Sequence, residues 1–154
     1  MTTITLPAVF MRGGTSKAVM FHLRDLPAER ADWDRLFLAA MGSPDPYGRQ
    51  LNGMGGGISS LSKVCVIAPS ARNDADVDYT FAQVQIREPR VDYRANCGNM
   101  SSAVGPFAMD EGLVRADGGI NYLLCRFAFG SLTWAEAERS ISLFTRHVMG
   151  EFVR

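Results

Sequence analysis

Residues 96–103 read Asn96-Cys97-Gly98-Asn99-Met100-Ser101-Ser102-Ala103, and the pattern of the chain changes within them. A polar, extended run ends at Asn96, and small and apolar residues then recur at helical spacing. Asn96 suits a helix cap, and the first turn of a helix has free backbone N–H groups that favour an anion. The stretch predicts either a carboxylate site with a reactive Cys97 thiol, close to the open backbone of Gly98, or an ordinary buried cysteine beside a cap.

Composition predicts one globular domain for the 154 residues, since 47% are hydrophobic and 21% charged. Sixteen Lys+Arg balance sixteen Asp+Glu, and without a basic stripe we expect no nucleic acid partner. No apolar run reaches the length of a membrane span, and the first ten residues lack the pattern of a secretory signal. We therefore expect a cytoplasmic protein with no membrane partner.

The cysteines and histidines indicate neither a disulfide framework nor a metal site. Cys65, Cys97 and Cys125 are odd in number and form no CxxC pair, which is typical of a reducing compartment. His22 and His147 have no neighbour at metal-ligand spacing, so we interpret both as surface or packing residues.

The first third of the chain predicts a strand over Ile4–Phe10, a turn over Met11–Lys17 and a return strand over Ala18–Phe21. Backbone N–H groups of that turn, together with the guanidinium fork of Arg12, would bind a carboxylate. A tight hairpin whose glycines serve only the turn is the simpler interpretation. A surface helix is expected over Pro27–Met41.

The middle of the chain places a lysine at the mouth of a buried strand. The near-continuous apolar run Val64–Ala68 is typical of a strand that is buried on both faces. Lys63 precedes it, and such a lysine is either an acid/base group or, more commonly, a surface lysine with a buried stem. The glycine run Gly53–Gly57 either admits a ligand to the backbone or simply connects elements.

Three further elements are expected downstream. Val77–Ile86 alternates as a strand does, and Gly112 is expected to close the helix that follows Cys97. Leu123–Phe129 predicts a strand, and Thr133–Glu136 has the form of a capping box that opens a final helix.

Several blocks resemble, in residue type and order, the PrpF-type proteins, a family that includes methylaconitate cis-trans isomerases and oxalomesaconate tautomerases. The resemblance extends over roughly residues 5–118. It is carried by Met11–Lys17, Met41–Asp45, Arg49–Gly56, Ser62–Val64, Asp76–Tyr79, Asn96–Asn99 and Gly105–Ala108.

The resemblance implies an α+β domain of the diaminopimelate-epimerase-like fold, a mixed or antiparallel, barrel-like sheet wrapped on a central helix that starts near Cys97. We expect residues 1–118 to form this N-terminal domain, and residues 119–154 to be a tail outside the family, with a strand and a helix. Family members are more than twice this length and have their active site between two domains. The resemblance therefore implies a truncated and impaired family member.

By resemblance, the function is that of a cofactor-independent isomerase, without a metal, which shifts a double bond in an unsaturated dicarboxylate or tricarboxylate. Lys63 and Cys97 are implied as the acid/base pair. Removal of a proton gives an enolate-like intermediate, whose charge is stabilised by donors to the carboxylates. The implied substrate-binding residues are Arg12, Gly13, Gly14, Thr15, Ser16, Gly55, Gly56, Ser62, Gly98 and Asn99.

Two alternatives stay open. A thiol-based amino-acid racemase or epimerase of the same fold needs two opposed cysteines, and neither Cys65 nor Cys125 has the helix-start context of Cys97. A catalytically silent fragment or interaction module is the other alternative. The expected partners are a small di- or tricarboxylate substrate and a second copy of the chain, in a homodimer that would cover the exposed interdomain surface.

Overall fold

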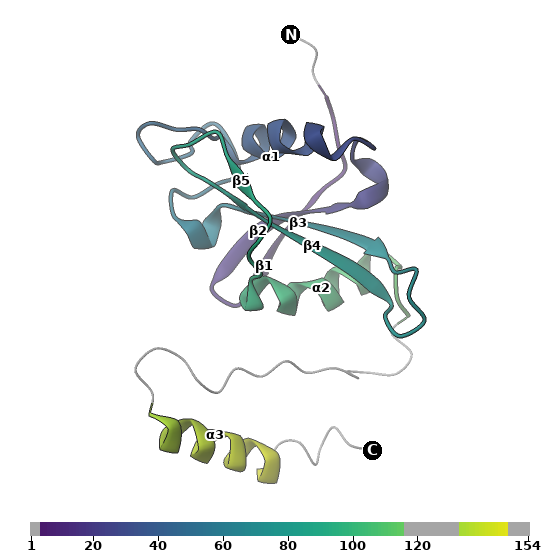
Figure 1. Ribbon diagram of the computed structural model, residues 1–154, viewed down its shortest axis with the longest axis vertical. Helices are drawn as coiled ribbons and strands as arrows, with labels where there is room; N and C mark the ends of the chain where they lie inside the picture. Colours follow the sequence, from purple (N-terminus) through teal and green to yellow (C-terminus); the bar gives the residue numbers. More distant parts are fainter. Residues whose placement is uncertain (1–3, 116–132, 148–154) are drawn as a thin grey trace. The chain divides into compact units, whose positions relative to one another are not determined.

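The computed structural model describes residues 4–115 and 133–147, and the chain divides into two units at Val114 and Arg115, which are treated separately below. Unit 1 holds an open, mixed sheet in the order β1-β2-β3-β4-β5 (Figure 1). Only β2 and β3 pair in parallel; the other neighbouring strands are antiparallel. The strands are β1 (Val9–Gly13), β2 (Ser16–His22), β3 (Lys63–Pro69), β4 (Val77–Val84) and β5 (Val91–Asp92).

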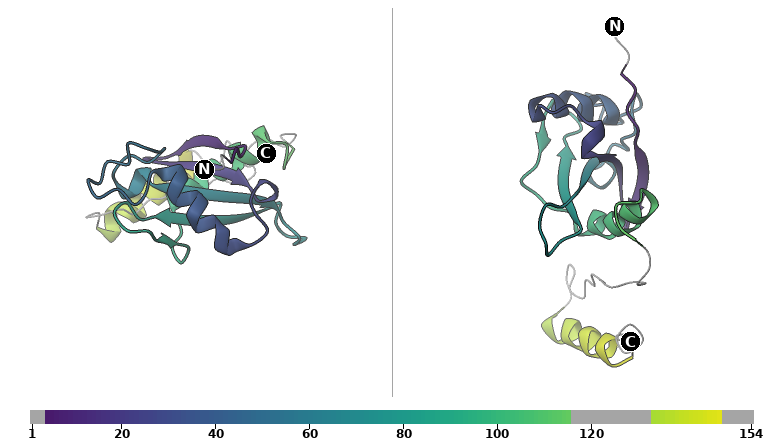
Figure 2. Two further views of the ribbon diagram at one scale, coloured as in Figure 1. Left: turned by 90° about the horizontal axis from the view of Figure 1, so that it is seen from above. Right: turned by 90° about the vertical axis from the view of Figure 1, so that its right-hand side faces the viewer.

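Two helices cover the two faces of this sheet, as the views in Figures 1 and 2 agree. Helix α1 (Trp33–Met41) belongs to the long crossover that a parallel pair requires between β2 and β3. Helix α2 (Gly98–Asp110) follows β5 and packs against β1, β2 and β3. The expected α+β class is confirmed; the sheet of the described residues is open, so barrel-like closure remains a prediction.

Alternation along β3 gives each helix its own apolar core. Val64 and Val66 face the α1 side, where they join Phe21 and Phe37. Cys65 and Ile67 face the α2 side, where they join Met20, Phe81, Met100, Ala103 and Phe107. Because both sets of β3 side chains are buried, the strand has the continuous apolar sequence from which burial on both faces was predicted.

The first strand and the first helix begin later than the sequence indicated. Strand β1 starts at Val9 and extends to Gly13, so only Gly14 and Thr15 form the turn before β2. Helix α1 starts at Trp33 rather than at Pro27, because Arg30–Asp32 forms a 3-10 turn instead of an α-helical one. Two other 3-10 turns lie at Leu23–Asp25 and Ser59–Leu61.

Glycines end both helices of unit 1 near the predicted positions. Gly42 follows α1 in the left-handed region (φ 73°), and its N–H donates to the carbonyl of Ala39. Gly112 (φ 68°) stands just after α2, which runs continuously through Pro106. At this end of α2, His22 is buried, as a packing residue would be, 3.1 Å from a carboxylate oxygen of Glu111.

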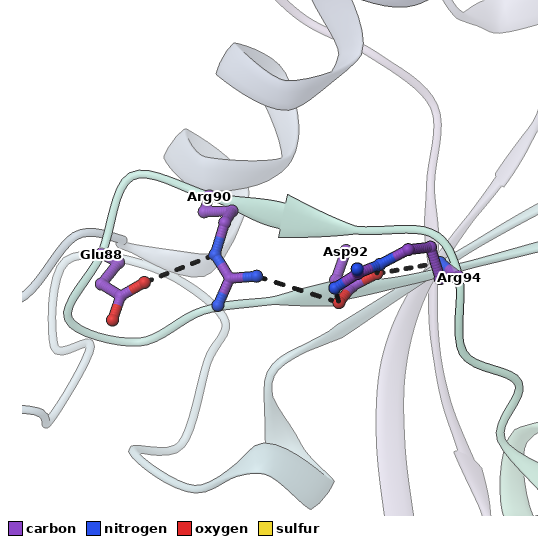
Figure 3. Close-up of polar contacts among 4 residues, drawn as sticks. All are labelled: Glu88, Arg90, Asp92 and Arg94. Atoms are coloured by element: carbon purple, nitrogen blue, oxygen red, sulfur yellow. Dashed lines mark hydrogen bonds and ion pairs between the residues drawn. The ribbon is translucent and has the colours of Figure 1, made fainter.

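Strand β5 forms one edge of the sheet, and charges of alternating sign lie on it and on the segments before and after it (Figure 3). Arg90 lies 3.4 Å from Glu88 and 3.9 Å from Asp92. Arg94 binds the Asp92 carboxylate through two N–H groups, at 3.0 and 2.7 Å, and these bonds hold the pKa of Asp92 well below its usual range. Charges on a very short strand make a poor template for another strand.

Unit 2 is described only over residues 133–147, where α3 (Trp134–His147) begins with the predicted capping box. The Thr133 N–H and hydroxyl donate to Glu136 Oε2 at 2.8 and 2.7 Å, and the Glu136 N–H donates back to Thr133 Oγ1 at 3.4 Å. The expected strand over 123–129 lies outside the described residues. Of the helices that the structure describes, none has the length and apolarity needed to cross a bilayer.

Candidate functional site

The start of α2 is the centre of the candidate site. Cys97 is the N-cap residue, with extended backbone angles (φ −125°, ψ 103°), and the helix begins at Gly98. Asn96 does not cap the helix as expected; its side-chain oxygen accepts a hydrogen bond from the Cys97 N–H at 2.7 Å. The Cys97 side chain makes no capping bond, and among the described residues no other side chain caps the first-turn N–H groups. The prediction of a helix that starts within two residues of Cys97 and ends near Gly112 is confirmed; the helix was also expected to be largely buried, and only one of its faces is.

The β1–β2 hairpin is pressed against this first turn. A Cβ on Gly13 would lie 2.2 Å from the Asn99 carbonyl oxygen, so only glycine allows this approach. Gly14 has φ 52° and would bring a Cβ within 2.8 Å of Asn99 Oδ1. The two glycines therefore serve the tight turn and the hairpin-to-helix contact. Gly98 differs, because within the described residues no heavy atom beyond its chain neighbours and the backbone of its own helix lies within 4 Å of the position of its Cβ.

Hydroxyl, amide and thiol groups from the hairpin and the helix meet at this contact. Asn99 Nδ2 donates to Thr15 Oγ1 at 2.9 Å and to Ser16 Oγ at 3.4 Å. Ser16 Oγ also lies 3.9 Å from Cys97 Sγ. Residues 81 to 84 positions apart in the sequence are thus joined in one polar cluster, Thr15, Ser16, Cys97 and Asn99.

Lys63 lies on the same face of the sheet as this cluster. It pairs with Ala18 across the parallel β2–β3 ladder, and Ser16 stands two residues before Ala18, so all three side chains share the α2 face. The lysine is only 7% exposed. Its Nζ donates to Gln83 Oε1 at 2.6 Å and lies 5.0 Å from the centre of the Phe81 ring.

Cys65 and Tyr79 continue the same face toward its apolar part. Cys65 Sγ lies 3.7 Å from the Tyr79 hydroxyl. Burial raises the pKa of the Cys65 thiol to about 12, and the nearby charge of Lys63 offsets this only slightly. Burial, followed by the neighbouring Cys65, also raises the pKa of Tyr79 above its usual range. Both groups stay protonated at neutral pH.

The structure does not bring Arg12 into this cluster. Because β1 extends to Gly13, Arg12 is a strand residue and pairs with Lys17. It directly follows Met11, and neighbouring residues of a strand point to opposite faces. Met11 packs on the α2 side, so Arg12 leaves the sheet on the opposite face, with Lys17 and Phe10. The turn from Arg12 to Ser16 was expected to converge with Lys63 and Cys97. Thr15 and Ser16 meet Asn99 and Cys97, Arg12 does not, and Lys63 shares their face of the sheet.

Ser62 and Gly55 pack against Gln50, and Gly56 packs against Leu61. Ser62 is fully buried; its hydroxyl donates to the Val84 carbonyl at 2.9 Å and accepts from Gln50 Nε2 at 2.7 Å. A Cβ on Gly55 would lie 2.3 Å from the Gln50 side chain, and one on Gly56 2.6 Å from Leu61. These contacts give the three residues a packing role, so we do not include them in the substrate-binding set proposed below.

Sequence reasoning missed Gln83, the partner of Lys63. The signal was present, because alternation over the predicted strand puts residue 83 on the same face as Tyr79 and Phe81, where an amide needs a polar partner. It also missed Gln50, a buried residue with φ 53° that organises the glycine-rich loop. In the part of the chain that the structure describes, no group of three or more His, Cys, Asp or Glu side chains is placed to hold a metal ion.

Comparison with known proteins gives this α+β domain relatives that are named as isomerases and tautomerases. Residues 3–126 match the sequence profile of the family described as PrpF protein, and the chain belongs to that family. The expected resemblance is thereby confirmed. The match ends eight residues beyond the expected boundary at 118, while the compact units divide at 114.

Individual relatives are similar over the first three quarters of the chain. The 2-methyl-aconitate isomerase of Cupriavidus necator is 53% identical over an alignment of 118 residues, and the match covers 73% of this chain and 30% of that protein. The 4-oxalomesaconate tautomerase of Pseudomonas putida is 56% identical over 113 residues, 73% of this chain and 31% of that protein. The crystal structure of methylitaconate-delta-isomerase superposes with a TM-score of 0.69 at 50% identity, covering 72% of this chain and 28% of that one. The chain thus spans about 30% of the length of these relatives.

Proposed function

We propose that unit 1 provides the acid/base half of an isomerase that moves a carbon–carbon double bond within an unsaturated di- or tricarboxylate. The observation that carries the proposal is the shared α2 face, where Lys63 lies on the same side of the sheet as the cluster Thr15, Ser16, Cys97 and Asn99. The relatives named above are isomerases of methylaconitate, oxalomesaconate and methylitaconate, all of which fit this substrate class.

The reaction needs one proton removed and one returned. Loss of a proton from the carbon next to the unsaturated acid spreads negative charge onto a carboxylate, and donors aimed at that carboxylate stabilise the charge. Lys63 and Cys97 are the groups proposed to exchange protons with the substrate, one as base and the other as acid. The neutral, buried Cys65 thiol lies beyond them and takes no part.

The start of α2 is the proposed carboxylate site. Its first-turn N–H groups have no side-chain cap, and an anion there also meets the positive end of the helix dipole. Thr15, Ser16 and Asn99 add hydroxyl and amide donors at the same place. Gly98, with open space at its Cβ position, is where the substrate approaches the backbone.

The same proposal says what completes the site and how active the short chain should be on its own. We infer an epimerase-like arrangement in which a second domain, or a second copy of this chain in a homodimer, closes the site over Gly98. The 154-residue chain assayed alone is expected to be a slow isomerase, because a site open to water loses positioning contacts, and a misplacement of about 1 Å can cost roughly 100-fold in rate.

A racemase of the same fold is the second candidate, and one observation weighs against it. Two-base racemisation by thiols requires a second accessible cysteine opposite Cys97. Cys65 is fully buried and its pKa is raised to about 12, so it does not supply that thiol. Cys125 lies outside the described residues.

The test is double-bond isomerisation of methylaconitate, oxalomesaconate and methylitaconate by the purified chain, followed by ultraviolet absorbance. Lys63→Ala and Cys97→Ala should each lower turnover by about 10²- to 10⁴-fold. Lys17→Ala, which removes the only other lysine in the sequence, and Cys65→Ala are the matched controls and should retain turnover.

Binding is measured in parallel, so that a slow chain still gives a result. Titration with the same acids should shift the backbone N–H signals of residues 98–100 in an NMR spectrum. Absence of both turnover and shifts would contradict the proposal and favour a silent module, and racemisation of an amino acid would favour the alternative.

A further inference from the structure

We infer that Gln83 is the positioning residue for Lys63: its side-chain amide fixes the place of the lysine Nζ on the α2 face. Lys63 Nζ donates a hydrogen bond of 2.6 Å to Gln83 Oε1, and the two residues are directly opposite each other in the β3–β4 ladder. Its functional meaning rests on the proposed role of Lys63 as an acid/base group.

The surroundings of Gln83 dictate which end of the amide faces the lysine. Its Nε2 lies 2.8 Å from the Ser62 carbonyl and 3.1 Å from the Ser59 carbonyl, and both of these oxygens can only accept. The nitrogen must therefore be at that end, since the opposite orientation would place oxygen against oxygen. Oε1 is left pointing at Lys63, and the lysine meets an acceptor held in place by two other bonds.

The same amide also ties down the backbone that leads into Lys63. Ser59 is the first residue of the 3-10 turn directly before β3, and Ser62 follows its last residue, so Gln83 joins this turn to β4. The lysine stem is long and flexible, and an unrestrained ammonium would sample many positions. With Gln83 accepting its bond and the Phe81 ring 5.0 Å away, Nζ is held in one place.

Neither of the two closest replacements reproduces this arrangement. Methionine has the length of glutamine but neither donates to the two carbonyls nor accepts from Lys63. Glutamate accepts from Lys63 but has no N–H, and it would set a carboxylate oxygen against the carbonyls of Ser59 and Ser62. This position needs a side chain that donates at one end and accepts at the other, and an amide does both.

The chain has only two lysines, Lys17 and Lys63, which makes a direct measurement practical. With ¹⁵N-lysine incorporated, the Lys63 ammonium signal should be visible at neutral pH because its protons exchange slowly, whereas the partly exposed Lys17 signal should be lost to exchange. A Lys63 ammonium that exchanges as fast as that of Lys17 in the unaltered chain would overturn the inference without any variant.

Variants then separate positioning from a general effect on folding. Gln83→Met should raise trace acetylation of Lys63 relative to Lys17 by at least threefold, measured by mass spectrometry. The matched control is Gln85→Met: Gln85 lies two residues further on, and within the described chain its hydrogen bond is a backbone one to the Arg90 carbonyl (3.0 Å). This control should leave the ratio unchanged. If circular dichroism shows Gln83→Met unfolded, the ¹⁵N-lysine measurement on the unaltered chain, which needs no variant, decides the inference.

Turnover distinguishes this inference from the proposed function. Gln83→Met should lower kcat about tenfold with little change in KM, because a misplaced Nζ affects proton transfer more than binding. If Lys63→Ala abolishes turnover while Gln83→Met changes neither the acetylation ratio nor kcat, the positioning role is wrong. If Gln83→Met changes the ratio while Lys63→Ala leaves turnover intact, positioning stands and the role of Lys63 in the reaction is wrong.

Discussion

The two faces of one sheet differ in what they bury. On the α1 face, aromatic rings pack around Phe37, with centres 5.9 Å from Phe21, 5.9 Å from Trp33 and 6.5 Å from Tyr93. On the α2 face, the apolar core gives way at one end to Ser16, Lys63 and Gln83, and Ser16 Oγ lies 3.9 Å from Cys97 Sγ. The same strands supply the side chains of both faces, because alternate residues of a strand point to opposite sides of the sheet.

The difference separates the part that secures the fold from the part that is free for chemistry. Polar groups on the α1 side, such as Ser62 and Gln50, are bonded to one another and to backbone. Polar groups at the start of α2 include an uncapped helix terminus and a glycine with open space at its Cβ position. Substitutions on the first side should therefore change stability, and those on the second should change binding and turnover.

The largest expected loss of stability comes from Phe37→Ala. The ring is fully buried at the centre of the aromatic cluster, so its removal should lower the free energy of unfolding by about 3–5 kcal/mol. Urea unfolding followed by circular dichroism measures this loss. The Cys97→Ala variant, at the partly exposed cap on the other face, should lose less than about 1 kcal/mol. Equal losses would remove the distinction between the faces.

A polar residue on the α1 side provides a sharper test. Ser62→Ala should lower the free energy of unfolding by about 1–3 kcal/mol, because the Val84 carbonyl loses its donor and the Gln50 amide loses an acceptor. In the isomerisation assay the KM of this variant should be unchanged. A stable Ser62→Ala chain with a raised KM would return Ser62 to the substrate site, where the sequence had placed it.

Two glycines on either side of the hairpin-to-helix contact form a matched pair. Gly13→Ala should cost about 1–3 kcal/mol of unfolding free energy, since its Cβ would meet the Asn99 carbonyl. Gly98→Ala should cost nothing in stability, because the described part of the chain places no neighbour at its Cβ position and alanine is the better helix former. It should nevertheless weaken carboxylate binding in the NMR titration. Unweakened binding by Gly98→Ala would move the proposed site away from the helix start.

The smallest effect concerns alkaline pH and the buried thiol of the α2 face. The folded state holds the pKa of Cys65 at about 12, above its ordinary value of 9.0, so above pH 9 the unfolded state releases the proton and the folded state does not. Stability should therefore fall as the pH rises, by about 1 kcal/mol between pH 9 and 10. Urea unfolding of Cys65→Ala should show this slope reduced by that amount; an unchanged slope would mean that Cys65 is not buried as a neutral thiol.

Much of the scaffold was predictable because it is encoded locally. The continuous apolar run 64–68 has no polar face to turn to water, so it indicates a strand buried on both faces. The pattern change at residues 96–100 marks a helix start. Helix α1 was overextended because charged residues at helical spacing do not distinguish an α-helical turn from the 3-10 turn at Arg30–Asp32. Local pattern thus predicts where elements lie better than where they begin.

The site was only partly predictable, because it depends on strand register and on contacts between distant residues. Thr15, Ser16 and Asn99 were expected in one place and are joined by hydrogen bonds. Arg12 was placed in the turn, but the strand extends three residues further than predicted, to Gly13, and its register sends the Arg12 side chain to the other face. Gln83 became evident only from its register opposite Lys63.

The alternating charges along β5 have a consequence for the protein in concentrated solution. Glu88, Arg90, Asp92 and Arg94 stand at every second position on and around the two-residue strand, so these four side chains are all charged and sum to no net charge (Figure 3). An incoming strand from another molecule would have to strip water from all four groups, whatever the ionic strength, because the obstacle is dehydration rather than repulsion. This edge should therefore resist aggregation in high salt as well as in low salt.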